Sequence, residues 1–353
     1  MASLIDISAL TLNTEEAQEI GKLIIEKAFV QGSLADVHDI ETGVLHDMQI
    51  PFAGQIADSL KAASGCTPNT GSGVAMTEKV WTPKIYDSRW THCAADLNKL
   101  FKLFQKAQRI NPDFYDRISS QEMGVIYALI EQMLETTLTN KVWFSDTAAD
   151  DVDGAGVFTS GEDLDLWNVI DGLFKQIFAE VGSGDDNYVA ISENGGASYA
   201  AQALSAGDAV TYLTAMRNAA DSRLLADPGA KFLVTRSLAD NYRDSLRSGT
   251  FGAGFLEVIE GGKPTLYFDG YEVVTMHQWD RTIKASQDSG TAWNLPHRAI
   301  FTTPENIPVA TLSTNDLSTL DSFYDRTLKS NIIDVAFSLD AKHLEPYMTV
   351  AAY

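Results

Sequence analysis

The side chains that could do chemistry in this chain do not show the spacings that catalysis or metal binding requires. No two of the six histidines are four residues apart, and no histidine has a cysteine at zinc-binding spacing. The sequence contains no G-x-S-x-G nucleophile elbow. GSG at 71–73 and GAG at 252–254 lack the further glycine of a phosphate-binding loop. The sequence therefore predicts no catalytic residues and no cofactor site.

One acidic run suggests a calcium site, but its pattern is incomplete. Asp150, Asp151, Asp153 and Gly154 lack the D-x-D-x-D-G order and the later glutamate of an EF-hand loop. His38 and His46, eight residues apart in an acidic segment, do not form a ligand pair either. We therefore expect no bound metal.

Composition indicates a folded protein with one large domain or two or three intertwined ones. The chain has 353 residues, 45% of them hydrophobic, and only 10 prolines. No stretch approaches 18 uncharged apolar residues, and the first residues lack the basic leader of a secretory signal. Two cysteines cannot build a disulfide framework, so we expect reduced thiols in a cytosolic product.

The net charge of −22 argues against sequence-specific binding of nucleic acid, which needs clustered lysine and arginine. The charge is uneven along the chain. Residues 1–75 carry ten acids and three bases, 76–117 carry eight bases and five acids, and 144–216 carry thirteen acids and one base. Such blocks are usually solvated faces, but the basic segment could also contact an acidic neighbour in this chain or in another copy.

Helical periodicity and capping signals predict six helices. The clearest runs over 119–140, because Ser119 and Glu122 form a capping box ahead of a regular apolar stripe. Ser237 is expected to cap another helix that ends near Arg247. The other predicted helices span 15–31, 94–108, 164–181 and 205–225.

Short apolar runs and turn signals predict the strands. Asp269-Gly270 is a hairpin signal between strands at 265–268 and 271–276. Residues 32–75 show little periodicity, and 77–91 could be the returning strand of a long hairpin. Further strands are expected at 231–235, 255–259, 298–303, 308–312, 332–339 and 345–351. The sequence thus predicts an α+β fold with much extended chain.

The order of these elements, together with four local segments, resembles a known family. The segments are AMRNAADSRLLADPGAKFLVTRSLADNYRDSL (215–246), KPTLYFDGYEVVTM (263–276), HRAIFTTPENIPVAT (297–311) and NIIDVAFSLDAKHLEPYMTVAAY (331–353). They follow an acidic arm, a long basic hairpin and a capped rod ending in LTNKVWFSD. The chain resembles the tailed-phage major capsid proteins of the Hong Kong 97-type fold, although Glu272 stands where many relatives have proline.

The resemblance implies a division of the chain into the parts of that fold. Residues 1–45 would form the N-terminal arm and helix, and 46–93 the extended loop. Residues 94–190 and 312–353 would form the peripheral domain, with its long spine helix at 119–140. Residues 191–311 would form the central axial domain.

The implied function is that of a shell protein without enzymatic activity or cofactors. It would assemble into hexamers and pentamers around packaged double-stranded DNA that it contacts without sequence specificity. Further implied partners are a portal, a separate scaffold or maturation protein, and a decoration protein. The expected location is the virion, with assembly in the host cytoplasm and no membrane partner. The alternatives are an encapsulin-like nanocompartment shell and, in a different class, a soluble enzyme or binding module with an unrecognised site.

The residues expected to contact other subunits lie in the arm and in the loop. They are Leu4, Ile5, Ile7, Leu10, Trp81, Lys84, Tyr86, Arg89 and Trp90. For the aromatic residues, packing within their own hairpin is an equally good explanation.

Overall fold

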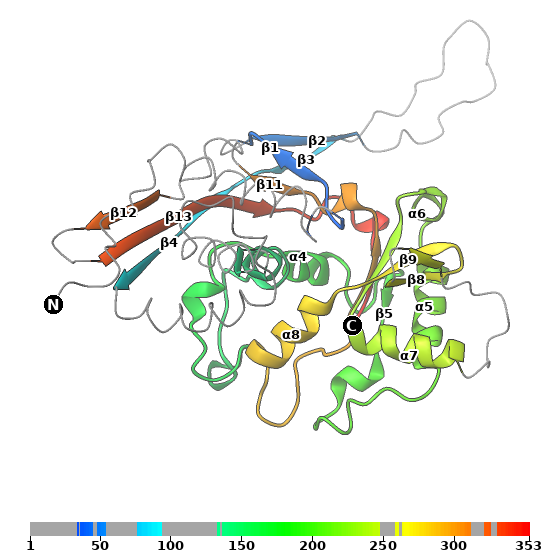
Figure 1. Cartoon of the computed structure of the whole chain (residues 1–353). Coiled ribbons are helices and arrows are strands. Elements are labelled where there is room, and N and C mark those ends of the chain that lie inside the picture. Colours follow the sequence, from blue (N-terminus) through cyan, green and yellow to red (C-terminus); the bar gives the residue numbers. More distant parts are fainter. Residues whose placement is uncertain are drawn as a thin grey trace, which may run out of the picture.

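The computed structural model describes residues 34, 36–44, 48–53, 76–93, 133–134, 136–247, 258–260, 263–311, 321–325 and 330–353. Within them, a long narrow sheet extends from one side of a body in which helices pack around a second sheet (Figure 1). A short two-stranded hairpin stem leaves the same region of the molecule.

The larger sheet contains seven described strands and forms the centre of the body. In spatial order they are β5 (Tyr188–Val189), β14 (Val350–Ala352), β10 (Ala299–Thr302), β6 (Lys231–Val234), β9 (Tyr271–Thr275), β8 (Lys263–Phe268) and β7 (Val258–Glu260). The chain therefore returns at its C-terminal end to pair β14 with β10 and β5.

This sheet separates two apolar cores because successive residues of a strand point to opposite faces. Phe232 and Val234 of β6 pack into one core, where Phe232 stacks on Phe301 with ring centroids 4.1 Å apart. Helices α5 (Asp208–Ala219) and α7 (Arg236–Arg247) contribute to that core. Leu233 points into the other core.

The second core is built around tryptophan and phenylalanine rings. Trp143, at the end of a helix that runs through residues 136–144, meets Trp279 edge to face at 4.6 Å. Helices α8 (His277–Ser286) and α4 (Leu173–Glu180) supply the remaining helical contacts.

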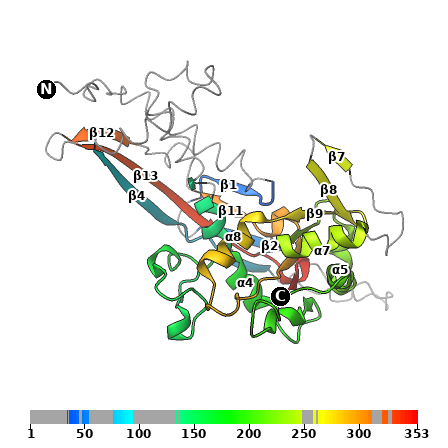
Figure 2. The same ribbon diagram turned by 60° about the horizontal axis from the view of Figure 1, so that its bottom comes forward.

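The narrow sheet carries the longest strands of the described chain. In spatial order it contains β1 (Ile40–Thr42), β11 (Val309–Thr311), β13 (Ser330–Ala341) and β12 (Asp321–Asp325), and β4 (Lys84–Cys93) pairs with β13 on its other side. Figure 2 shows β4 along the outer side of β13. The antiparallel register runs from Lys84 opposite Leu339 to Cys93 opposite Ser330.

The stem of the predicted long hairpin is present. Strand β2 (Gln49–Ala53) pairs antiparallel with β3 (Met76–Val80), with Gln49 opposite Val80 and Ala53 opposite Met76. The expected single strand over 77–91 is instead divided into β3 and β4 by residues 81–83.

Most predicted strands are confirmed, and the Asp269-Gly270 turn is found between β8 and β9. Both turn residues have positive φ, 51° and 91°, as the tightest hairpin turns require. Glu272 lies in β9, which is paired on both sides, and its side chain forms an ion pair with Lys231 at 3.2 Å. The strand expected at 345–351 is shorter, because residues 346–348 form a 3₁₀ turn before β14.

Several helix boundaries were predicted wrongly. The helix expected over 164–181 is a 3₁₀ turn at Leu164–Leu166 followed by α4, which begins only at Leu173. The helix expected over 205–225 breaks at the extended Ala220, and Asp221 caps the separate α6 (Ser222–Ala226).

Two further corrections concern α7 and α8. Helix α7 begins at Arg236, one residue before the expected Ser237 cap, and the Asp280 carboxylate accepts its backbone N–H at 2.6 Å. Helix α8 was not predicted. It begins at His277, just after the strand that follows the Asp269-Gly270 turn. The predicted helices at 15–31 and 94–108, and residues 119–132 of the helix predicted over 119–140, lie outside the described residues. That helix ends at Phe144 and not near 140.

Candidate functional site

The loop residues predicted to contact other subunits occupy two different environments. Trp81 is only 1% exposed and packs with Val44 and Ala310, and its backbone N–H donates to the Met48 carbonyl. The Trp81 side chain is thus packed within its own subunit, and its role in contacts between copies stays a prediction. Tyr86 is half-buried and stacks on Phe337, with ring centroids 5.4 Å apart.

The charged loop residues lie on the surface of the narrow sheet. Lys84 is exposed at the start of β4. Arg89 donates to both carboxylate oxygens of Asp334 on β13, at 2.6 and 2.7 Å, across a directly opposed strand pair. Their role in contacts between copies stays a prediction. The Trp90 side chain and Leu4, Ile5, Ile7 and Leu10 lie outside the described residues.

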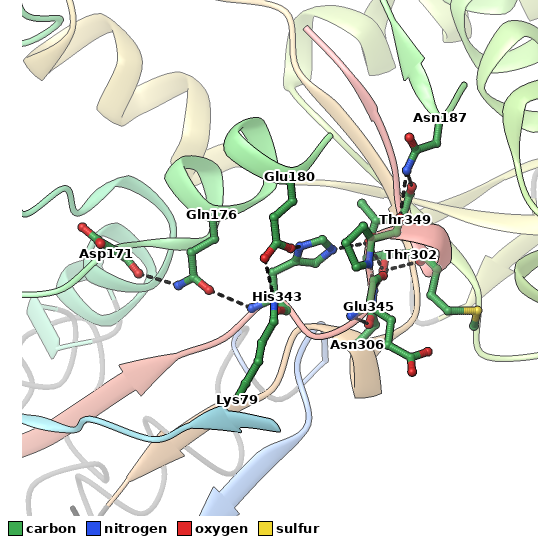
Figure 3. Close-up of polar contacts among 12 residues, drawn as sticks. Lys79, Asp171, Gln176, Glu180, Asn187, Thr302, Asn306, His343, Glu345 and Thr349 are labelled. Atoms are coloured by element: carbon green, nitrogen blue, oxygen red, sulfur yellow. Dashed lines mark hydrogen bonds and ion pairs between the residues drawn. The ribbon is translucent and has the colours of Figure 1, made fainter. Parts of the chain in front are cut away.

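An extended cluster of polar side chains lies where the hairpin stem meets the two sheets (Figure 3). We call it the junction cluster. Its members are Lys79, Gln176, Glu180, Asn187, Thr302, Asn306, His343, Glu345 and Thr349. They come from the stem, α4, the residue before β5, the end of β10, the following turn, and the segment between β13 and β14.

Lys79, Glu180 and His343 form the centre of the cluster. The Lys79 ammonium lies 2.7 Å from the Glu180 carboxylate and also donates to the His343 backbone carbonyl. The other Glu180 oxygen lies 2.5 Å from His343 Nδ1. The sequence prediction that the basic segment contacts an acidic neighbour is thereby confirmed within the chain for Lys79.

The electrostatics of this centre favour a charged carboxylate and a neutral imidazole. Burial lowers the pKa of His343, although the Glu180 carboxylate opposes that shift. Burial also disfavours ionised Glu180, but the hydrogen bonds from His343 and Lys79 outweigh it and hold its pKa below the usual value. Lys79 and Glu180 therefore form the charged pair. His343 connects Glu180 to Thr349, the residue before β14.

The rest of the cluster extends this link into the seven-stranded sheet. His343 Nε2 lies 2.8 Å from Thr349 Oγ1, which also accepts a hydrogen bond from Asn306 at 2.8 Å. Asn306 Oδ1 accepts from the Glu345 backbone N–H at 2.8 Å, and Thr302 Oγ1 donates to the Met348 carbonyl. The hairpin stem is thus connected to both sheets through side chains that are mostly buried.

Gln176 and Asn187 close the cluster on the side of α4 and β5. Gln176 donates to the Ala341 carbonyl at 2.8 Å and accepts the His343 backbone N–H at 3.0 Å. Asn187 donates to the carbonyls of Pro346 and Thr349. These hydrogen bonds fix the backbone on both sides of His343 against α4 and the start of β5.

Sequence reasoning missed the junction cluster because its partners are far apart along the chain. Lys79 and Glu180 are 101 residues apart, and His343 lies 163 residues beyond Glu180. No short-range sequence pattern predicts contacts between residues so far apart. The only signal was the opposite charge of the two segments that carry Lys79 and Glu180.

The candidate metal ligands use their polar atoms elsewhere. Asp151 accepts the backbone N–H groups of Asp153 and Gly154, and it caps a 3₁₀ turn. His38 uses one ring nitrogen toward the Ile307 carbonyl and the other toward the Trp143 indole N–H. Among the described residues, no group of three or more histidine, cysteine or acidic side chains could hold a metal ion.

The helices that can be described are too short or too polar to cross a bilayer.

No protein-family model and no curated protein matches the sequence. Solved structures do match. The capsid of Cyanophage P-SCSP1u has a TM-score of 0.52 at 13% identity, covering 91% of this chain and 88% of its own. A chain of Gordonia phage Cozz has a TM-score of 0.54 at 11% identity, covering 90% of this chain and 84% of its own. The bacteriophage PhiM1 mature capsid has a TM-score of 0.50 at 11% identity, covering 91% of this chain and 86% of its own.

The likeness extends over nearly the whole of both chains, so the protein has the mixed helix-and-sheet fold of phage capsid proteins. The neighbours described by function are capsid structures and not enzymes. At sequence identities of 11–13%, the structural likeness establishes the fold alone.

Proposed function

We propose that this protein is the major capsid protein of a tailed double-stranded DNA phage, with the Hong Kong 97-type fold. The observation that carries the proposal is the match to phage capsid structures over 90% or more of the chain. Self-assembly into hexamers and pentamers would make the chain its own main partner. The remaining partners, a portal, a separate scaffold or maturation protein and a decoration protein, belong to the same proposal.

The contacts within the chain support a subunit whose extended parts are firmly anchored. The hairpin stem is connected to the body by buried Trp81 and by the Lys79–Glu180 pair. A hairpin anchored in this way can transmit force from its distal residues 54–75 to both sheets. We infer that these residues and the N-terminal arm reach adjacent copies, whereas the anchor stays within the subunit.

The division into arm, extended loop, peripheral domain and axial domain remains part of the proposal. Its axial part contains β6, α7 and the β8–β9 hairpin, all in or against the seven-stranded sheet. The excess of acidic residues suits an inner surface from which packed DNA is repelled without being bound.

Sedimentation velocity of the purified protein over a range of concentrations tests the proposal. We expect one population of very large particles beside free subunits or small capsomers. Particles that hold a single protein cargo and no nucleic acid would favour a nanocompartment shell. A compact monomer at every concentration, with or without scaffold, would contradict both kinds of shell.

A further inference from the structure

A groove with a volume of about 420 Å³ runs between β4 and the helix that ends at Phe144. Four successive residues of β4, 85–88, line it. Because successive side chains of a strand point to opposite faces, four in a row reach one groove only if it follows an edge of the strand. β13 occupies one edge of β4, so the groove follows the other edge. It continues under the face of the sheet on which Tyr86 stacks on Phe337 of β13, which also lines it.

That edge has no partner among the described strands, where β4 pairs with β13 alone (Figure 2). An unpaired edge presents a row of backbone N–H and C=O groups that can take up another strand. β4 is ten residues long and carries Ile85, which is 74% exposed, near its start. Across the groove, Leu166 is 50% exposed and Met133 is partly buried.

The groove also contains a cation that has no counter-ion among the described residues. Lys141 is only 7% exposed, and its ammonium lies 5.1 Å from the Trp167 ring centroid and 5.9 Å from that of Tyr86. No described residue forms an ion pair or hydrogen bond with it. Burial lowers the pKa of Lys141 to about 8, although Asp163 and Glu162 act against that shift from a distance.

The nearby carboxylates have other functions. Glu162 accepts the Trp167 indole N–H, and Asp163 caps the turn at Leu164–Leu166. Asp87 and Asp165 line the groove as well, but both are exposed to water. The groove thus suits an extended, mainly apolar segment that brings a single carboxylate to Lys141.

One segment of the chain has this composition. In LIDISAL, residues 4–10, Asp6 is the only charged side chain between Met1 and Asn13. In an extended conformation Leu4, Asp6 and Leu10 share one face, and the β-branched Ile5 and Ile7 favour a strand. The 33 residues before Leu34 can span roughly 110 Å when extended, enough to reach a neighbouring copy.

We propose that residues 4–10 of a second copy of this chain add as a strand to the free edge of β4, with Asp6 against Lys141. The inference rests on the proposed function, because it requires copies to lie side by side. It assigns a location to the arm and a role to Lys141 that the sequence did not indicate. Backbone hydrogen bonds would supply affinity, and the Asp6–Lys141 pair would set the register.

Disulfide trapping in assembled particles tests the location. Two full-length variants, Ser8→Cys and Ser88→Cys, each in a Cys66→Ser, Cys93→Ser background, are mixed before assembly and then oxidised. We expect a reducible dimer that contains one chain of each kind. Ser289→Cys, exposed in the loop after α8, is the control partner for Ser8→Cys and should give no dimer.

The other outcomes would overturn the placement of the arm, and they distinguish its failure from failure of the proposed function. A link that forms only within a chain carrying both Ser8→Cys and Ser88→Cys would assign the groove to the arm of the same copy. A link from Ser88→Cys to Ser59→Cys instead would assign it to residues 54–75. Particles without any link would refute the inference and leave the proposed function standing, whereas absence of particles would refute both.

The charge pair is tested by the rate of the same cross-link. Lys141→Met and Asp6→Asn should each slow it about tenfold, the effect of losing roughly one charge-assisted hydrogen bond. The two together should slow it no further, and Lys141→Arg should restore most of the rate. Lys284→Met is the matched control, because Lys284 also lies over a tryptophan ring but is exposed. Equal rates in Lys141→Met and in the parent would overturn the assignment.

Discussion

Three buried histidines, His38, His297 and His343, use both ring nitrogens in hydrogen bonds within the chain. For His38 the pattern requires the neutral ring, because one nitrogen must accept the Trp143 indole N–H. Burial lowers the pKa of all three, that of His38 to about 4. Protonation therefore opposes folding at each of them.

The sign of the resulting pH dependence follows from linkage. Below about pH 6.5 the unfolded chain binds protons that the folded chain does not, so the free energy of unfolding falls as pH falls. His38 alone contributes about 1.4 kcal/mol per pH unit between roughly pH 6.5 and its folded pKa of about 4.

Replacement of His38 tests this linkage. We expect His38→Gln to be less stable at pH 7 and to lose stability less steeply between pH 6 and 4.5, in urea unfolding followed by tryptophan fluorescence. The exposed His277→Gln is the control and should keep the parental slope. Parallel profiles for His38→Gln and the parent would show that His38 does not titrate on unfolding.

The centre of the junction cluster allows a second prediction at the residue scale. Glu180→Leu leaves Lys79 and His343 Nδ1 without their shared acceptor, so we expect a loss of about 1–3 kcal/mol in the free energy of unfolding. Asp244→Asn, which breaks the highly exposed pair with Arg247, should cost less than about 0.5 kcal/mol. Equal losses in the two variants would mean that the junction cluster contributes no more than a surface ion pair.

At the scale of elements, the late start of α4 has a steric cause. Gly172 precedes the helix, and a Cβ there would lie 2.9 Å from both the backbone N and O of Ser145. The Gly172 N–H also donates to the Ser145 carbonyl at 2.7 Å. The chain must therefore pass tightly over the preceding helix end before α4 can begin.

Gly172→Ala tests this close approach. We expect a loss of about 1–3 kcal/mol in the free energy of unfolding, typical of overpacking against rigid backbone. Gly195→Ala is the matched control, because a Cβ at Gly195 would meet nothing within 4 Å. A thermal midpoint for Gly172→Ala equal to that of Gly195→Ala would contradict the steric explanation.

The elements that the sequence predicted correctly are those with local causes. β6 is a short apolar run, and the β8–β9 hairpin follows from Asp269 and Gly270, whose positive φ angles need no distant partner. Helix boundaries failed where tertiary contacts decide them, as at Gly172 and at the Asp280 cap of α7. Helix α8 was missed because its buried face contains Thr282 and Ser286 beside Trp279 and Ile283.

At the scale of the whole molecule, we propose that the anchored stem separates folding from assembly. Trp81 and Lys79 fix the hairpin stem to the body, and we propose that the distal residues of the hairpin serve contacts between copies. Deleting residues 66–75 should therefore leave the thermal midpoint nearly unchanged and abolish particle formation. A Gly/Ser replacement of equal length is the control for loop length and should also fail to assemble if these side chains make the contacts. Normal particles from the deletion variant would refute the assembly role of the loop.

We propose that copies of this chain form a closed shell. Electron microscopy of the purified protein under assembly conditions tests this proposal most directly. We expect closed icosahedral particles whose capsomers are hexamers and pentamers of the chain. A homogeneous compact monomer at high concentration, in the presence of scaffold or after its removal, would contradict it.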